Sequence, residues 1–176
     1  MVSSLGRVQD YSPEYYMGTD GSVTMALGTV LLAVGPGDAD RIDRLAEETI
    51  DITGPSDATV VLGHVFTDDE YVESLNRLGF DTTSGEVSPD DVASRHATIR
   101  ELIGQLDEAG VKHAVSGAVG GHGDSIVSLA EKAAADLVIV GGRQRSPAGK
   151  AVFGSTAQEV MLSAPCPVTF VRADTS

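Results

Sequence analysis

The stretch that decides the fold is Thr29-Val30-Leu31-Leu32-Ala33-Val34. Its apolar residues follow one another without alternation, which is typical of a strand that is buried on both faces of a parallel sheet. The turn residues Gly35-Pro36-Gly37-Asp38 come next, and a helix with one apolar face is predicted over residues 39–50. A buried strand, a turn and an amphipathic helix form the first part of a β-α-β unit.

The same unit repeats along the rest of the chain. Four more apolar runs predict strands over residues 58–66, 112–119, 137–140 and 168–172. Helices are predicted over residues 69–78, continuously from Ser88 to about Ala109, from Asp124 as a cap to about Ala134, and over residues 155–163. This alternation predicts a single-domain α/β fold, a five-stranded parallel sheet with helices on both faces. Such sheets bind ligands at the carboxyl ends of their strands.

Composition sets the size and surroundings of this domain. With 176 residues, 41% of them hydrophobic, the chain can bury one substantial core. Residues 1–27 show no sustained periodicity and are predicted to form a poorly ordered arm before a domain over residues 28–174. No run approaches about 20 apolar residues and no secretory signal is recognisable, so a cytoplasmic location is expected. The single cysteine, Cys166, is expected to be a small buried residue.

The net charge of the chain argues against polyanionic partners. Its formal net charge is −14, from 26 acidic against 12 basic side chains spread along the sequence. Without a basic patch, neither nucleic acid nor an anionic membrane is expected as a partner. An acidic coat with few lysines also favours a halophilic protein, because concentrated salt screens self-repulsion.

The loop over residues 141–156 is the strongest candidate for a ligand site. Gly154-Ser155-Thr156 precedes the last predicted helix, whose free N–H groups attract an anion. Arg143, Arg145 and Lys150 add three cations, which favours a phosphate group. The alternative is an exposed loop that is merely flexible. The loop is not a P-loop, because Gln144 stands where the first glycine is required and Ala151 follows Lys150.

A family resemblance follows from this loop and its neighbours. The strand over 137–140, the loop and the ending Ala164-Pro165-Cys166-Pro167-Val168-Thr169-Phe170-Val171-Arg172 resemble the universal stress protein family, in a haloarchaeal form. The likeness includes Gly63-His64-Val65 and the segment over 120–130, and it extends from Gly28 to Arg172. It implies a sheet of strand order 3-2-1-4-5, of the type found in adenine nucleotide alpha hydrolases.

The resemblance also implies a ligand, ATP or another adenine nucleotide. The ribose and phosphates would lie near Val140, Gly141, Arg143 and Gln144. Gly154, Ser155 and Thr156 would bind the phosphates, and Gly35 and Val65 would lie at the base. Two positions depart from the family pattern. Gln144 replaces a glycine, and Gly35 replaces the aspartate that contacts adenine. Asp38 or Asp40 could supply that carboxylate, although both also suit a helix start.

No catalytic residue and no metal site is predicted. Ser155 has no histidine or acid at a useful spacing, and the spacing of His64, His96, His113 and His122 suggests no metal ligands. His64 is expected to be a buried histidine with satisfied hydrogen bonds.

These features favour a nucleotide-responsive stress or signalling protein without strong catalysis. A homodimer is expected through residues 168–172, an apolar edge strand. Three alternatives stay open: a slow ATPase, a relative of electron-transfer flavoproteins, and an interaction module that binds no nucleotide. Gly35 and Gln144 support the last of these.

Overall fold

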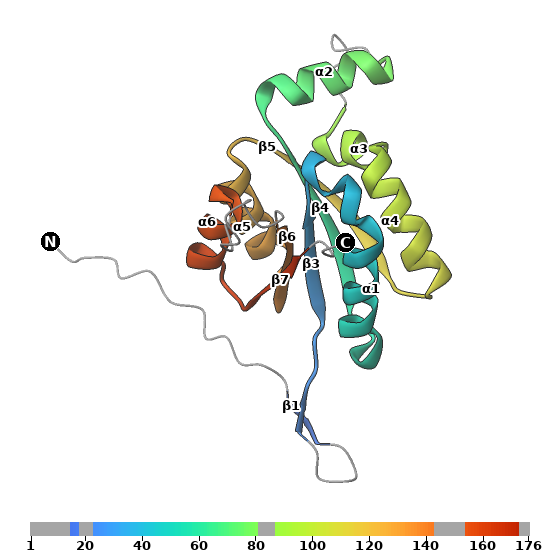
Figure 1. Ribbon diagram of the computed structural model, residues 1–176, viewed down its shortest axis with the longest axis vertical. Helices are drawn as coiled ribbons and strands as arrows, with labels where there is room; N and C mark the ends of the chain where they lie inside the picture. The colour runs from blue at the N-terminus through green and yellow to red at the C-terminus, as the bar shows by residue number, and fades with distance from the viewer. Residues whose placement is uncertain (1–14, 18–22, 81–86, 143–153, 173–176) are drawn as a thin grey trace, which may run out of the picture.

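A five-stranded parallel sheet forms the centre of the protein (Figure 1). The computed structural model describes residues 15–17, 23–80, 87–142 and 154–172. Along the sheet the strands are β5 (His113–Val119), β4 (Thr59–Phe66), β3 (Thr29–Val34), β6 (Leu137–Gly142) and β7 (Val168–Arg172). All four pairings are parallel. The order, counted in chain sequence from β3, is 3-2-1-4-5, so the predicted fold class is confirmed.

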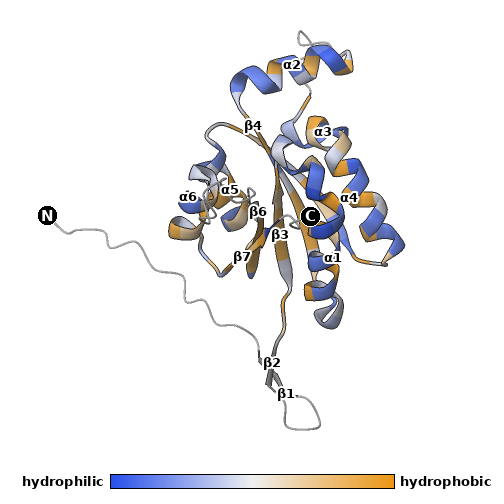
Figure 2. Ribbon diagram, in the orientation of Figure 1, coloured by the Kyte–Doolittle hydropathy of each residue, from blue (hydrophilic) through white to orange (hydrophobic). Residues whose placement is uncertain are grey.

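Helices cover both faces of this sheet. The helical elements are η1 (Pro36–Arg41), α1 (Ile42–Thr53), η2 (Gly54–Ser56), α2 (Asp68–Leu78), α3 (Pro89–Ser94), α4 (Ala97–Glu108), α5 (His122–Lys132) and α6 (Ser155–Ser163). α1 and α4 contribute to the core on one face, and α5 and α6 to the core on the other. Figure 2 shows hydrophobic residues along the central strands and mixed colouring on the helices.

The burial of β3 on both faces explains why its sequence does not alternate between apolar and polar residues. Val30, Leu32 and Val34 belong to the core under α1 and α4, whereas Leu31 and Ala33 belong to the core under α5 and α6. All five are 5% exposed or less. Because successive side chains of a strand point to opposite faces, a strand covered on both faces must be apolar at every position.

The helix predicted from Ser88 to Ala109 is wrong, because the structure splits it into α3 and α4. His96 lies between them in an extended conformation, with φ −67° and ψ 136°. The physical reason is tertiary packing. α3 lies along β5, where the Gly117 N–H donates to Asp90 Oδ1 at 2.6 Å, while α4 packs on α1. One straight helix could not make both contacts.

The predicted cap of α5 needs correction. α5 begins at His122 with Gly121 as its N-cap, so Asp124 lies in the first turn and is not the cap. Before β3 the structure describes β1 (Tyr15–Met17) and β2 (Val23–Met25), which pair antiparallel. This hairpin lies beyond the amino end of β3 (Figure 1).

The two edges of the sheet differ. The edge at β5 is covered by α3, so closely that a side chain on Gly117 would overlap the backbone of Pro89. At the other edge, β7 pairs only with β6 among the described residues. Cys166 lies just before β7, partly buried, and burial raises the pKa of its thiol. None of the helices in the described ranges is long and apolar enough to cross a bilayer.

Candidate functional site

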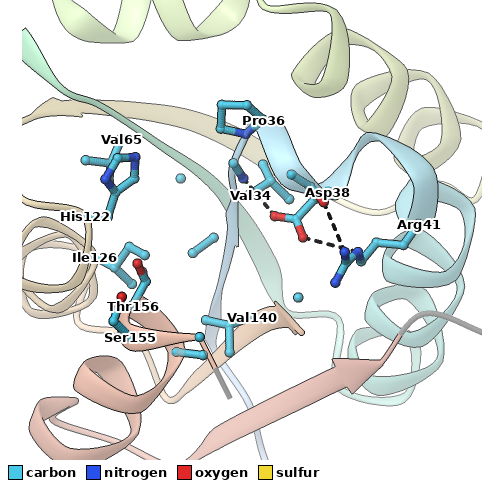
Figure 3. Close-up of a pocket in the computed structure, with 17 residues that line it drawn as sticks. Val34, Pro36, Asp38, Arg41, Val65, His122, Ile126, Val140, Ser155 and Thr156 are labelled. Atoms are coloured by element: carbon cyan, nitrogen blue, oxygen red, sulfur yellow. Dashed lines mark hydrogen bonds and ion pairs between the residues drawn. The ribbon is translucent and has the colours of Figure 1, made fainter. Parts of the chain in front are cut away.

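A pocket of about 300 Å³ lies at the carboxyl ends of β3, β4 and β6 (Figure 3). After β3 the chain builds outward through β4 to β5, and it then returns to the other side of β3 as β6. The crevice at such a reversal is where open α/β sheets bind ligands. The lining residues are Ala33, Val34, Gly35, Pro36, Gly37, Asp38, Arg41, Gly63, Val65, His122, Ile126, Val140, Gly141, Gly154, Ser155, Thr156 and Ala157.

One wall of the pocket holds an acid and a base that bind each other. The Gly35 N–H donates to Asp38 Oδ2 at 2.8 Å, and Arg41 Nε lies 3.4 Å from Asp38 Oδ1. Arg41 also donates to the Gly37 carbonyl at 3.0 Å, and its side chain is only 6% exposed. Burial raises the pKa of the Asp38 carboxyl, although the bond from Gly35 and the charge of Arg41 oppose this change. Both groups are therefore held rigidly.

The opposite wall is built from the first turns of α5 and α6. Gly154 is the N-cap of α6 and Gly121 is the N-cap of α5, and neither helix has a side-chain cap. The N–H groups of a first helical turn have no acceptor inside the helix, and they carry a partial positive charge. Figure 3 shows His122, Ser155 and Thr156 across the pocket from Asp38 and Arg41. This wall suits an anion.

His122 is linked to the start of α2. Its Nε2 lies 3.8 Å from Glu70 Oε2. Glu70 completes the capping box of α2, in which its carboxylate accepts from the Thr67 N–H at 2.8 Å. That bond is the main reason why the pKa of the Glu70 carboxyl is lowered, so Glu70 is a stable anion beside the His122 ring.

Glycines keep the floor of the pocket flat. A Cβ on Gly63 would lie 2.9 Å from Leu31 Cδ1, and a Cβ on Gly141 would overlap the Asp38 carboxylate. Side chains at these two positions would therefore displace core or site residues. Their missing side chains thus let Leu31 and Asp38 pack against the ends of β4 and β6.

Comparison with known sequences identifies the family. The sequence profile of the universal stress protein family matches residues 27–172. The chain belongs to the universal stress protein family. A universal stress protein of Mycolicibacterium smegmatis is 28% identical over 96 residues, which are 54% of this chain and 74% of that protein.

Solved structures share the fold of this universal stress protein. One is the universal stress protein from Archaeoglobus fulgidus in complex with dAMP, with a TM-score of 0.55 at 19% identity, covering 84% of this chain and 99% of that one. Another is a universal stress protein in complex with cAMP, with a TM-score of 0.60 at 21% identity, covering 85% and 99%.

Most of the site residues predicted from sequence lie together in this universal stress protein. The pocket is lined by Gly35, Val65, Val140, Gly141, Gly154, Ser155 and Thr156. The other two predicted positions, Arg143 and Gln144, lie outside the described residues, as do Arg145 and Lys150. Of the two acids considered as substitutes for the family aspartate, Asp38 lines the pocket and Asp40 does not.

Sequence reasoning missed Arg41 as a pocket residue, whereas it placed His122 in a segment, residues 120–125, that could touch a ligand across the crevice. Arg41 follows Asp38 by three positions, a spacing that predicts an ion pair on a helical turn, so this signal was present. His122 is the first residue of α5. Its place in the pocket depends on how the end of β5 meets β4, which a local pattern does not record.

His64 is buried as predicted, but its hydrogen bonds are not all satisfied. It is 1% exposed, and its Nδ1 has no hydrogen-bond partner among the described residues. Its ring packs against His96, with centroids 4.3 Å apart, and against Phe66 at 4.5 Å. Burial, followed by the nearby His96, lowers the pKa of His64 from 6.5 to about 4. No group of three or more metal-ligating side chains gathers within the described ranges.

Proposed function

We propose that this universal stress protein binds an adenine nucleotide in the pocket at the ends of β3, β4 and β6, as part of a stress or signalling response. The observation that carries the proposal is the meeting of two uncapped helix N-termini, of α5 and α6, at one pocket wall. A phosphate group is the natural ligand of such a wall. The dAMP and cAMP in the two related structures support the adenine nucleotide class.

The two walls assign an orientation to the nucleotide. The phosphates lie at Gly154, Ser155 and Thr156, where N–H groups and hydroxyls donate. The base lies toward Val65 and Asp38. Asp38 Oδ2 accepts one hydrogen bond from the Gly35 N–H, and Oδ1 forms an ion pair with Arg41, so the carboxylate keeps lone pairs that can accept from the adenine amino group. In this way Asp38 replaces the carboxylate missing at Gly35. ATP is the expected nucleotide, because the loop sequence supplies Arg143, Arg145 and Lys150 for a triphosphate.

The proposal extends to assembly and surroundings. We expect a homodimer through β7, since the other edge of the sheet is covered by α3. The net charge of −14 supports a cytoplasm rich in salt, as in halophilic archaea.

Isothermal titration in molar KCl tests the proposal, with ATP, ADP, AMP and cAMP as ligands and nucleotide hydrolysis followed in parallel. We expect saturable binding of at least one adenine nucleotide by the parent protein and none by Gly154→Val, which places a branched side chain on the phosphate wall. Gly104→Ala, on α4 and away from the pocket, is the control that keeps parent affinity. Absence of heat and of a thermal shift with every nucleotide at millimolar concentration would leave the interaction module as the better reading. Turnover of ATP would instead favour the slow ATPase.

A further inference from the structure

A second cavity, of about 220 Å³, lies between α2 and the break that separates α3 from α4. It shares no lining residue with the pocket at the strand ends. In Figure 1, α2 lies above α3 at the upper end of the sheet, which is the region of this cavity. The lining residues are Ser74, Arg77, Leu78, Val92, Arg95, His96 and Ala97.

Two solvent-exposed arginines, Arg77 and Arg95, line this cavity. Neither Arg77 nor Arg95 forms an ion pair with any residue that the structure describes. Acids are nevertheless close in sequence. Glu73 lies one helical turn before Arg77. The carboxylate of Asp91 accepts from the hydroxyl and the backbone N–H of Ser88, at 2.6 and 3.0 Å, and these bonds, with a smaller effect from the charge of Arg95, lower its pKa. In a chain with 26 acidic and 12 basic side chains, two such guanidinium groups at one cavity form a local positive site.

The first turn of α4 opens at the same cavity. His96 is the N-cap of this 12-residue helix and makes no side-chain cap bond, and Ala97, the first helical residue, lines the cavity. The first N–H groups of the helix therefore add a partial positive charge next to the two guanidinium groups. This helix start exists because the chain breaks at Arg95 and His96.

The surrounding side chains hold the cavity in shape. The guanidinium of Arg95 lies over the Phe80 ring, 4.2 Å from its centroid. The His96 ring stacks on His64, and burial and then the charge of Arg77 lower the pKa of His96. His96 is thus a neutral inner wall, and the positive charge comes from the two arginines and the helix.

Each arginine also has an ordinary structural role. Arg77 lies in the last turn of α2, where a cation offsets the helix dipole, and Arg95 packs on Phe80. Neither role requires both guanidinium groups to line one cavity in front of an uncapped helix.

We propose that this cavity is a second ligand site, which binds a small oxyanion of the phosphate or carboxylate type between Arg77, Arg95 and the start of α4. Planar guanidinium groups hold either anion with two parallel hydrogen bonds. The site is separate from nucleotide binding and does not depend on it.

An NMR titration with inorganic phosphate tests this site, at constant ionic strength and with AMP present to fill the first pocket. We expect saturable shifts of the Arg95, Ala97 and Thr98 amides at millimolar phosphate, and about tenfold weaker binding in the double variant Arg77→Gln, Arg95→Gln. Arg100→Gln, exposed on α4 outside the cavity, is the control that keeps parent affinity. Acetate in place of phosphate shows which anion type is preferred.

Two results would overturn the proposal. One is a linear, unsaturated response of these amides to both anions up to tens of millimolar. The other is saturation that the double variant leaves unchanged. If the double variant loses its dispersed spectrum, the two single variants take its place, and each should weaken binding while leaving the Ser155 and Thr156 amides unaffected.

Discussion

The carboxylate of Asp38 occupies the space that a side chain at Gly141 would need. A hydrogen bond from the Gly35 N–H and an ion pair with Arg41 hold that carboxylate in place. The end of β6 can therefore lie close to the turn after β3 because residue 141 has no side chain. The first prediction follows from this fit.

Gly141→Ala should destabilise the protein by about 1 to 3 kcal/mol, because the new methyl group displaces Asp38 from Gly35 and Arg41. Nucleotide affinity should fall as well, since the base-side wall is disturbed. Gly37→Ala is the matched control: it lies next to Asp38 in η1, and an added Cβ there meets no atom within 4 Å. Urea unfolding of both variants measures the difference in their free energies of unfolding. Equal values would show that a side chain at position 141 does not displace Asp38.

Ser155→Ala should weaken nucleotide binding about tenfold to a hundredfold, since a hydrogen bond to a charged group is worth about 1.5 to 3 kcal/mol. Ser163→Ala, at the exposed end of the same helix, should bind like the parent protein. Isothermal titration gives both affinities. A Ser155→Ala variant with parent affinity would mean that the phosphates do not lie at the start of α6.

Stability should fall as the pH drops from about 6.5 to about 4, because His64 has a pKa of about 4 in the folded protein and 6.5 as its ordinary value. Between these values the unfolded chain binds a proton that folded His64 does not, so the full contribution is present above pH 6.5. The loss by pH 4 should reach roughly 3 kcal/mol. The lowered pKa of His96 acts in the same direction.

The variants His64→Gln and His64→Phe remove this titration, so their unfolding free energies should depend less on pH across that window. Denaturant unfolding at several pH values provides the measurement. An equally steep dependence in both variants would assign the effect to other groups.

Phe170→Lys should convert the expected dimer into a monomer, because it places a charge on β7. Phe170 is partly buried against the core under α5 and α6, so circular dichroism must show that the variant is folded. Val171→Lys is not a suitable test, since Val171 is 5% exposed and belongs to the core under α1, so a charge there should unfold the chain. Light scattering after size exclusion measures the mass in molar salt. A parent protein that is already monomeric at micromolar concentration would rule out the β7 dimer.

Melting temperature should rise with KCl concentration from roughly 0.1 to 2 M, because salt screens the repulsion among 26 acidic side chains. Calorimetry at matched pH tests this expectation. A flat profile would remove the inference of a halophilic protein.

Local sequence patterns predicted the sheet well, because its strands are buried and apolar throughout. Thr29–Val34 was predicted with the bounds that the structure has, and the β-α alternation gave the parallel topology. The break at His96 was not predicted, since no glycine or proline marks it. Its cause is the approach of Pro89 to Gly117, 28 residues later in the chain.

The candidate site was also predicted only in part. The phosphate wall was predicted because its elements, Gly154-Ser155-Thr156, are adjacent in sequence. Arg41 was not, because its place depends on how η1 packs against the strand ends. A local sequence pattern does not show which distant segments of the chain contact each other.

The unequal edges of the sheet set a limit on how this protein can polymerise. A sheet with two open edges can add copies at both ends and grow into a filament. Here Asp90 accepts the Gly117 N–H and α3 lies along β5, so growth at that end is blocked by the chain itself. Strand addition at β7 in the proposed homodimer would therefore end at two copies, and such a closed pair could not extend into a fibre through its sheet edges.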